Sequence, residues 1–119
     1  MCRAFLMYGK CEKYPYLLTY FVNSFNKGNT DGYFLGISDK MNIRTMSFKK
    51  LLEFMYDNKE LIDGEEIVYG HARLATNSVC KKNIHGWNLN GWYCFHNGIN
   101  DIKDETNDND SWDFFKYVF

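Results

Sequence analysis

The apolar spacing in residues 14–25 restricts the fold more than any other feature, because it fits a helix and not a strand. Its apolar positions are Leu17, Leu18, Phe21, Val22 and Phe25. This spacing forms one stripe along a helix, and Pro15 suits the first helical turn. A helix with one apolar stripe buries it against another element, so we expect a layered domain.

A second helix and several short strands complete the expected pattern. Ser47 is suited to cap a helix. The apolar face of that helix would consist of Phe48, Leu51, Leu52, Met55 and Tyr56. A short buried strand is expected at 2–8, and further strands at 33–38, 42–46, 66–72 and 92–96. The remaining expected segments are a loop at 26–32, a turn at 63–64, a polar connection at 76–91 and a last helix from 111 to 119. This order predicts a single α+β domain over residues 1–119.

Charge and composition exclude several classes of protein. The net charge is −1 and the basic residues form no block, which argues against a nucleic-acid-binding protein. No apolar run is long enough to cross a membrane, and the first residues lack the pattern of a signal peptide. We therefore expect a cytoplasmic protein. In that compartment its four cysteines, Cys2, Cys11, Cys80 and Cys94, should be reduced thiols.

Cys2 is the first candidate for chemistry. If Met1 is removed, which a small second residue permits, Cys2 carries a thiol and a free α-amine on one residue. An α-amine has a pKa of about 7.7–8.0 and can accept the thiol proton near neutral pH. The alternative is a structural cysteine in the first strand, and position 2 alone favours that alternative.

Two further segments carry groups that suit amide chemistry. The segment 70–76, Gly-His-Ala-Arg-Leu-Ala-Thr, places Arg73 at the end of an expected strand, where its guanidinium can hold a carboxylate with two hydrogen bonds. The alternative is a surface ion pair. In the second segment, the Asn97 amide and the Gly98 N–H are two donors that could stabilise an oxyanion. Asn-Gly is also the commonest hairpin signal.

Two polar groups leave alternatives open. Asp110 precedes the last expected helix, where it can cap that helix, pair with a substrate ammonium, or do both. A zinc site formed by Cys80, His85, Cys94 and His96 is a further alternative. The spacings Cys-x4-His and Cys-x-His match structural zinc sites poorly.

In this order, the segments resemble the class II glutamine amidotransferases, which are N-terminal-nucleophile hydrolases. The chain begins Met-Cys, as that family does. Residues 70–76 match the family's Gly-His-x-Arg-x-Ala-Thr motif, and residues 96–101 resemble its His-Asn-Gly motif. Weaker similarities lie at 27–32, 83–86 and 109–112. The resemblance runs nearly end to end.

The resemblance implies a fold, a reaction and a set of roles. The fold would be a four-layer α-β-β-α sandwich, either whole or lacking its C-terminal part. Glutamine would be hydrolysed to glutamate and ammonia through a thioester on Cys2, with no cofactor and no metal. Arg73 would hold the substrate carboxylate and Asp110 its ammonium. The oxyanion hole would consist of Asn97 and the Gly98 N–H, and the backbone of Thr76 and Asn77 would add substrate contacts.

The same resemblance leaves the partner and the turnover open. It implies an ammonia-accepting synthase chain or domain, and a shortened domain favours a homo-oligomer. Lys27 stands where the family has arginine, Gly86 where it has proline and Trp112 where it has glutamate. The short chain and Lys27 favour the main alternative, a catalytically inactive glutamine-binding or regulatory protein of the same fold. A third alternative is an amidase of the same superfamily with another substrate.

Overall fold

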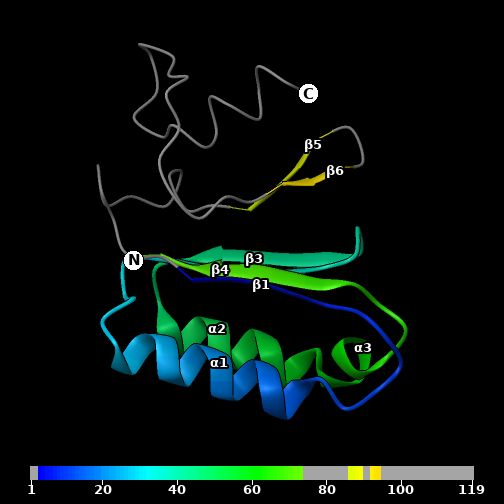
Figure 1. Ribbon diagram of the computed structural model, residues 1–119, viewed down its shortest axis with the longest axis horizontal. Helices are drawn as coiled ribbons and strands as arrows, with labels where there is room; N and C mark the ends of the chain where they lie inside the picture. The colour runs from blue at the N-terminus through cyan, green and yellow to red at the C-terminus, as the bar shows by residue number, and fades with distance from the viewer. Residues whose placement is uncertain (1–2, 74–85, 90–91, 95–119) are drawn as a thin grey trace.

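The fold is built on one antiparallel sheet with helices on one side and a small hairpin on the other (Figure 1). The computed structural model describes residues 3–73, 86–89 and 92–94. Its elements are β1 (Arg3–Met7), α1 (Tyr14–Asn26), β2 (Tyr33–Ile37), β3 (Met41–Thr45), α2 (Phe48–Asp57), α3 (Lys59–Asp63), β4 (Val68–Ala72), β5 (Trp87–Leu89) and β6 (Trp92–Cys94). The first sheet has the strand order β1-β4-β2-β3, and β5 pairs with β6. The predicted α+β class is confirmed.

Helix α1 forms where its apolar spacing predicts it, but its buried stripe is narrower. Pro15 lies in the first turn, and the buried residues are Leu17, Phe21 and Ser24. Val22 and Phe25 were expected in the stripe but are 37% and 41% exposed. Phe25 stacks instead on Phe48 of α2, with ring centroids 4.5 Å apart. The two helices therefore meet through aromatic side chains at the edge of the core.

Helix α2 is capped as predicted by Ser47, whose hydroxyl accepts a hydrogen bond from the Lys50 N–H at 3.2 Å. This bond satisfies one of the free donors at the helix start. Leu51 and Met55 are buried, whereas Tyr56, expected on the same face, is 72% exposed. The last turn of α2 is therefore less buried than a continuous apolar face would require.

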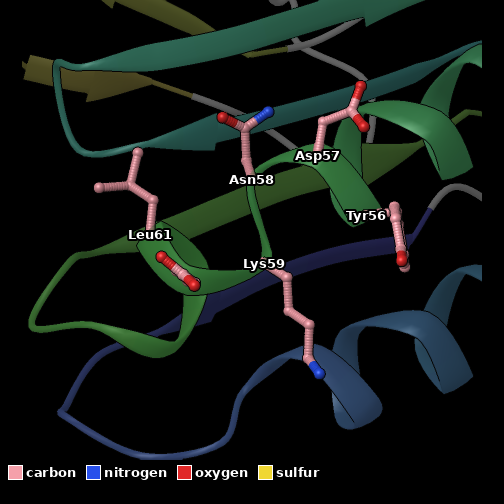
Figure 2. A pocket seen from close by; sticks show the side chains of 6 residues that line it. Tyr56, Asp57, Asn58, Lys59 and Leu61 are labelled. Atoms are coloured by element: carbon pink, nitrogen blue, oxygen red, sulfur yellow. The ribbon is translucent and has the colours of Figure 1, made fainter.

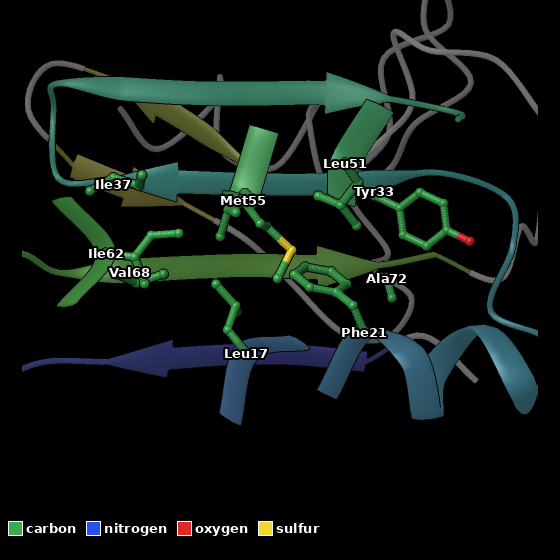
Figure 3. Close-up of a cluster of buried hydrophobic side chains, with 10 residues drawn as sticks. Leu17, Phe21, Tyr33, Ile37, Leu51, Met55, Ile62, Val68 and Ala72 are labelled. Carbon is green, nitrogen blue, oxygen red and sulfur yellow. The ribbon is translucent and has the colours of Figure 1, made fainter. Parts of the chain in front are cut away.

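The core lies between the helices and the first sheet (Figure 3). Its fully buried residues are Leu17, Phe21, Tyr33, Leu35, Ile37, Leu51, Met55, Ile62, Val68 and Ala72. They come from α1, α2 and α3 on one side and from β2 and β4 on the other. All three helices within the described residues therefore pack on the two central strands and share one core.

The two central strands are also buried on the face that points away from the helices. All residues of β2 and β4 are buried, including Phe34, Tyr69 and His71 on this second face. Figure 1 shows β5 and β6 on that side of the sheet. Strands buried on both faces belong to the inside of a layered domain, and side chains alternate between its faces. The described residues thus form helix, sheet and hairpin layers in that order.

Arg44 joins the hairpin layer to the first sheet. Its guanidinium donates a hydrogen bond to the Gly86 carbonyl, directly before β5, and lies 5.3 Å from the centre of the Phe34 ring. Burial lowers the pKa of Arg44, and the nearby Tyr69 opposes this shift. The Cβ of any other residue at position 86 would lie 2.2 Å from the Phe34 ring, so the chain can approach the sheet here only as glycine.

Three expectations for the local structure are wrong. The first strand was expected to be buried, but β1 is an edge of the sheet and Leu6 is 58% exposed. The expected polar connection at 76–91 contains β5, which pairs with β6. Helix α3 was not predicted beside the turn at 63–64, because five residues are too few to show helical periodicity. The expected last helix at 111–119 lies outside the described residues.

Gly70 is the position in β4 where the backbone packing tolerates no side chain. A Cβ there would lie 2.3 Å from the Phe34 carbonyl oxygen and 2.8 Å from the Phe5 ring. We expect Gly70→Ala to lower the free energy of unfolding by about 3 kcal/mol, because the neighbouring strand has to move. Urea denaturation measures this change.

The matched control for Gly70→Ala is Gly64→Ala. Gly64 has φ −78°, which any residue adopts, and its Cβ would be 3.3 Å from the nearest atom. That variant should stay within about 1 kcal/mol of the wild type. Equal destabilisation by both substitutions would contradict the crowding at Gly70.

No helix in residues 3–73, 86–89 and 92–94 is long and apolar enough to cross a membrane.

Candidate active site

Arg73 follows β4 directly and is held there by the loop that precedes β2. Its N–H donates to the Gly32 carbonyl at 2.9 Å, and its own carbonyl accepts from the Asp31 N–H at 3.0 Å. Two residues of the loop thus face the one residue that follows β4, which is the arrangement of a β-bulge. Arg73 itself is 2% exposed. The backbone that carries the guanidinium is therefore fixed on both of its hydrogen-bonding groups.

The loop 27–32 takes a shape that two glycines make accessible. Gly28 has φ +93° and Gly32 has φ +141°, a region that favours glycine. Between them, Asn29 is buried, and its backbone N–H donates to the Ser24 carbonyl in α1 at 2.9 Å. The Asn29 side-chain amide donates to the Ala72 carbonyl at 3.4 Å. The loop consequently links the end of α1 to the end of β4.

The chain enters the sheet at this same end (Figure 1). Arg3 is the first residue of β1 and pairs with Ala72, while Ala72 also pairs with Tyr33 of β2. Three segments that are far apart in the sequence, namely the start of β1, the loop 27–32 and the end of β4, therefore meet around Ala72 and Arg73. Cys2, which precedes Arg3 in the sequence, lies outside the described residues.

His71 lies on the second face of the sheet, towards the β5–β6 layer. It is fully buried and pairs with Ala4 on one side and with Phe34 on the other. Because successive side chains of a strand alternate between faces, Arg73 is expected on the same face as His71. The motif at 70–76 would thus direct its two basic side chains into the space between the two sheets.

Tyr33 directly follows the loop 27–32, and its side chain belongs to the core on the helix side of the sheet. Its phenol stays neutral. Burial and then the Asp31 carboxylate raise the pKa of Tyr33 to about 12. Its hydroxyl oxygen is buried and has no hydrogen-bond partner within the part of the chain that the structure describes. The phenol therefore adds no charge beside Asp31 at physiological pH.

Of the predicted site residues, Arg73 is the one that the structure describes. It lies at the end of β4 as predicted. The remaining predicted site residues, Cys2, Thr76, Asn77, Asn97, Gly98 and Asp110, lie outside the described residues, and their roles stay predictions. Asn29 was missed as a residue of this region. The only sequence signal for it was its position between two glycines in a loop.

Of the alternative zinc ligands, Cys94 alone falls in a described strand. Within residues 3–73, 86–89 and 92–94, no group of three or more histidine, cysteine and acidic residues could hold a metal ion.

A depression elsewhere in the described residues lies at the junction of two helices. It has a volume of about 670 Å³ and is lined by residues 56–61 at the junction of α2 and α3 (Figure 2). A smaller one of about 330 Å³ lies beside it, where Lys59 and Asp63 face the start of α1. Both lie near the beginning of β4, at the opposite end of the strand from Arg73. Neither is the candidate active site, because no predicted catalytic or substrate-binding residue lines them.

Comparisons with protein-family models, with curated proteins and with solved structures find no match for the chain.

Proposed function

We propose that the chain is a glutamine amidohydrolase, the glutaminase part of a class II glutamine amidotransferase with an N-terminal cysteine nucleophile. One observation carries this proposal. The start of β1, the loop 27–32 and Arg73 converge at one end of the sheet through the register of Ala72 and the bonds to Gly32 and Asp31. These are three of the segments on which the resemblance rests, and a shared active site requires them to be neighbours.

The nucleophile would be supplied by the residue before β1. Cys2 directly precedes Arg3 in the sequence, and Arg3 pairs with Ala72 at the end of β4. After removal of Met1, the α-amine of Cys2 accepts the thiol proton, and the thiolate attacks the side-chain carbonyl carbon of glutamine. The new S–C bond replaces the C–N bond, and ammonia leaves with the proton from the amine. Water then cleaves the thioester to give glutamate.

Substrate recognition would use charges of opposite sign. The Arg73 guanidinium binds the α-carboxylate through two hydrogen bonds, and Asp110 binds the α-ammonium. Backbone groups of Thr76 and Asn77 contact the rest of the substrate. Asn97 and the Gly98 N–H donate to the oxyanion as it forms, where such donors contribute most to the rate.

The layering of the domain supports the same proposal. An N-terminal-nucleophile hydrolase is a four-layer α-β-β-α sandwich, and the described residues supply helix, sheet and hairpin layers in that order. The burial of β2 and β4 on both faces fits such a sandwich. In this proposal the segment after β6, with its expected helix at 111–119, provides the fourth layer.

The use of the ammonia depends on a second component. We propose that the chain works in the cytoplasm and passes ammonia to a synthase chain or domain, and that it associates with a second copy of itself. The alternative is a protein that binds glutamine without turnover.

Incubation of the purified chain with glutamine tests the proposal. It should release glutamate and ammonia in equal amounts, and asparagine should be a much poorer substrate. If glutamine raises the melting temperature of the protein without ammonia release, the chain is a binding protein. If glutamine does neither, both functions are wrong.

A further inference from the structure

We infer that Asn29 is a positioning residue for Arg73, so that it sets the affinity for glutamine without touching the substrate. This inference rests on the proposed function, because it assigns a task to Arg73. Asn29 is 3% exposed, although it lies in a loop between two exposed neighbours, Gly28 and Thr30. A buried polar side chain in a surface loop is held there by specific hydrogen bonds.

The bonds of Asn29 run to the two elements that the loop connects. Its backbone N–H donates to the Ser24 carbonyl in α1, and its side-chain amide donates to the Ala72 carbonyl in β4. Ser24 and Ala72 are both buried in the helix-side layer of the molecule. Asn29 thereby links the loop to both α1 and β4.

The position of the loop in turn determines the backbone of Arg73. Gly32 and Asp31 hold the two hydrogen-bonding groups of Arg73, and both follow Asn29 within three residues. A loop that is free at Asn29 would let this bulge shift relative to β4. A guanidinium that binds a carboxylate in two bonds is sensitive to such a shift, because both hydrogen bonds depend on a fixed position of the planar donor pair.

A similar hydrogen bond at the other end of the molecule provides a control. It distinguishes an effect on the position of Arg73 from a general loss of stability. The Asn58 side-chain amide donates to the Phe54 carbonyl at 2.8 Å, and this residue is also partly buried. Asn58 belongs to the junction of α2 and α3 (Figure 2). Helix α3 lies near the beginning of β4, whereas Arg73 follows the end of that strand (Figure 1). The two asparagines thus share their chemistry but not their location.

The experiment compares Asn29→Asp with Asn58→Asp in the full chain, using glutamine as the probe. Each change retains the shape of the side chain, removes the amide donor and adds one negative charge, so the control carries the same change in chemistry. Asn29→Asp should raise KM for glutamine about tenfold, the factor that one net hydrogen bond represents, and leave kcat within about threefold. Asn58→Asp should leave KM within about twofold of the wild type. Denaturation curves of both variants show whether each one folds.

Three outcomes would overturn the inference. Equal KM values for Asn29→Asp and the wild type would leave the glutaminase proposal intact and remove the role of Asn29. Unfolding of both Asn29→Asp and Asn29→Ala, while Asn58→Asp folds, would make Asn29 a purely structural residue. A folded wild-type chain that releases no ammonia would overturn the proposed function itself, and the positioning role with it.

Discussion

Replacement of the second residue, Cys2→Ala, should abolish glutamine hydrolysis. The proposed reaction forms its thioester on this one sulfur, and no other group of the site replaces a lost nucleophile. Removal of a nucleophile typically lowers kcat by at least about 10⁴-fold, and we expect a loss of that size. The measurement is ammonia release at saturating glutamine, with the melting temperature as a check that the variant folds.

Cys11 provides the matched control for this prediction. It is an exposed free thiol in the segment between β1 and α1. Because it lies beyond the far end of β1 from Arg3, Cys11→Ala should leave the rate of ammonia release unchanged. Activity that survives Cys2→Ala but disappears in Cys11→Ala would identify Cys11 as the nucleophile and refute the proposed mechanism.

Replacement of Arg73 should mainly weaken the binding of glutamine. Arg73→Met retains much of the buried side-chain volume at a position that is 2% exposed, and it removes the proposed partner of the substrate carboxylate. Loss of a charged partner typically costs about 3 kcal/mol, so KM should rise about 10²-fold. The measurement is the dependence of ammonia release on glutamine concentration.

The second variant, Arg73→Lys, separates charge from geometry. Lysine keeps the positive charge but lacks the planar pair of donors that binds a carboxylate in two bonds. Its KM should therefore lie between those of the wild type and Arg73→Met. If KM stays at the wild-type value in both folded variants, Arg73 does not bind the substrate.

Regular elements were predictable wherever local chemistry alone decides them. The apolar spacing around Leu17 and Phe21 and the cap at Ser47 identified α1 and α2, because helix periodicity and capping are properties of neighbouring residues. Helix α3 and strand β5 were missed because three to five residues are too few for a period. The burial of Leu6 was overestimated because the sequence does not show which strand lies at an edge.

The candidate site was predictable only in part, for a related reason. Arg73 could be placed at the end of a strand, since the apolar run of β4 stops at Ala72. The contacts of Arg73 with Asp31 and Gly32 join positions about forty residues apart, and no local pattern encodes them. The same holds for Asn29, whose bond to Ala72 exists only once β2 and β4 have paired.

The most direct test of the central claim is the intact mass of the purified chain before and after incubation with 6-diazo-5-oxo-norleucine, a glutamine analogue that alkylates thiols. The account predicts a chain that has lost Met1 and gains a single adduct on Cys2, which glutamine suppresses and which is absent from Cys2→Ala. A chain that retains Met1, or a processed chain whose Cys2 stays unmodified, would contradict the account.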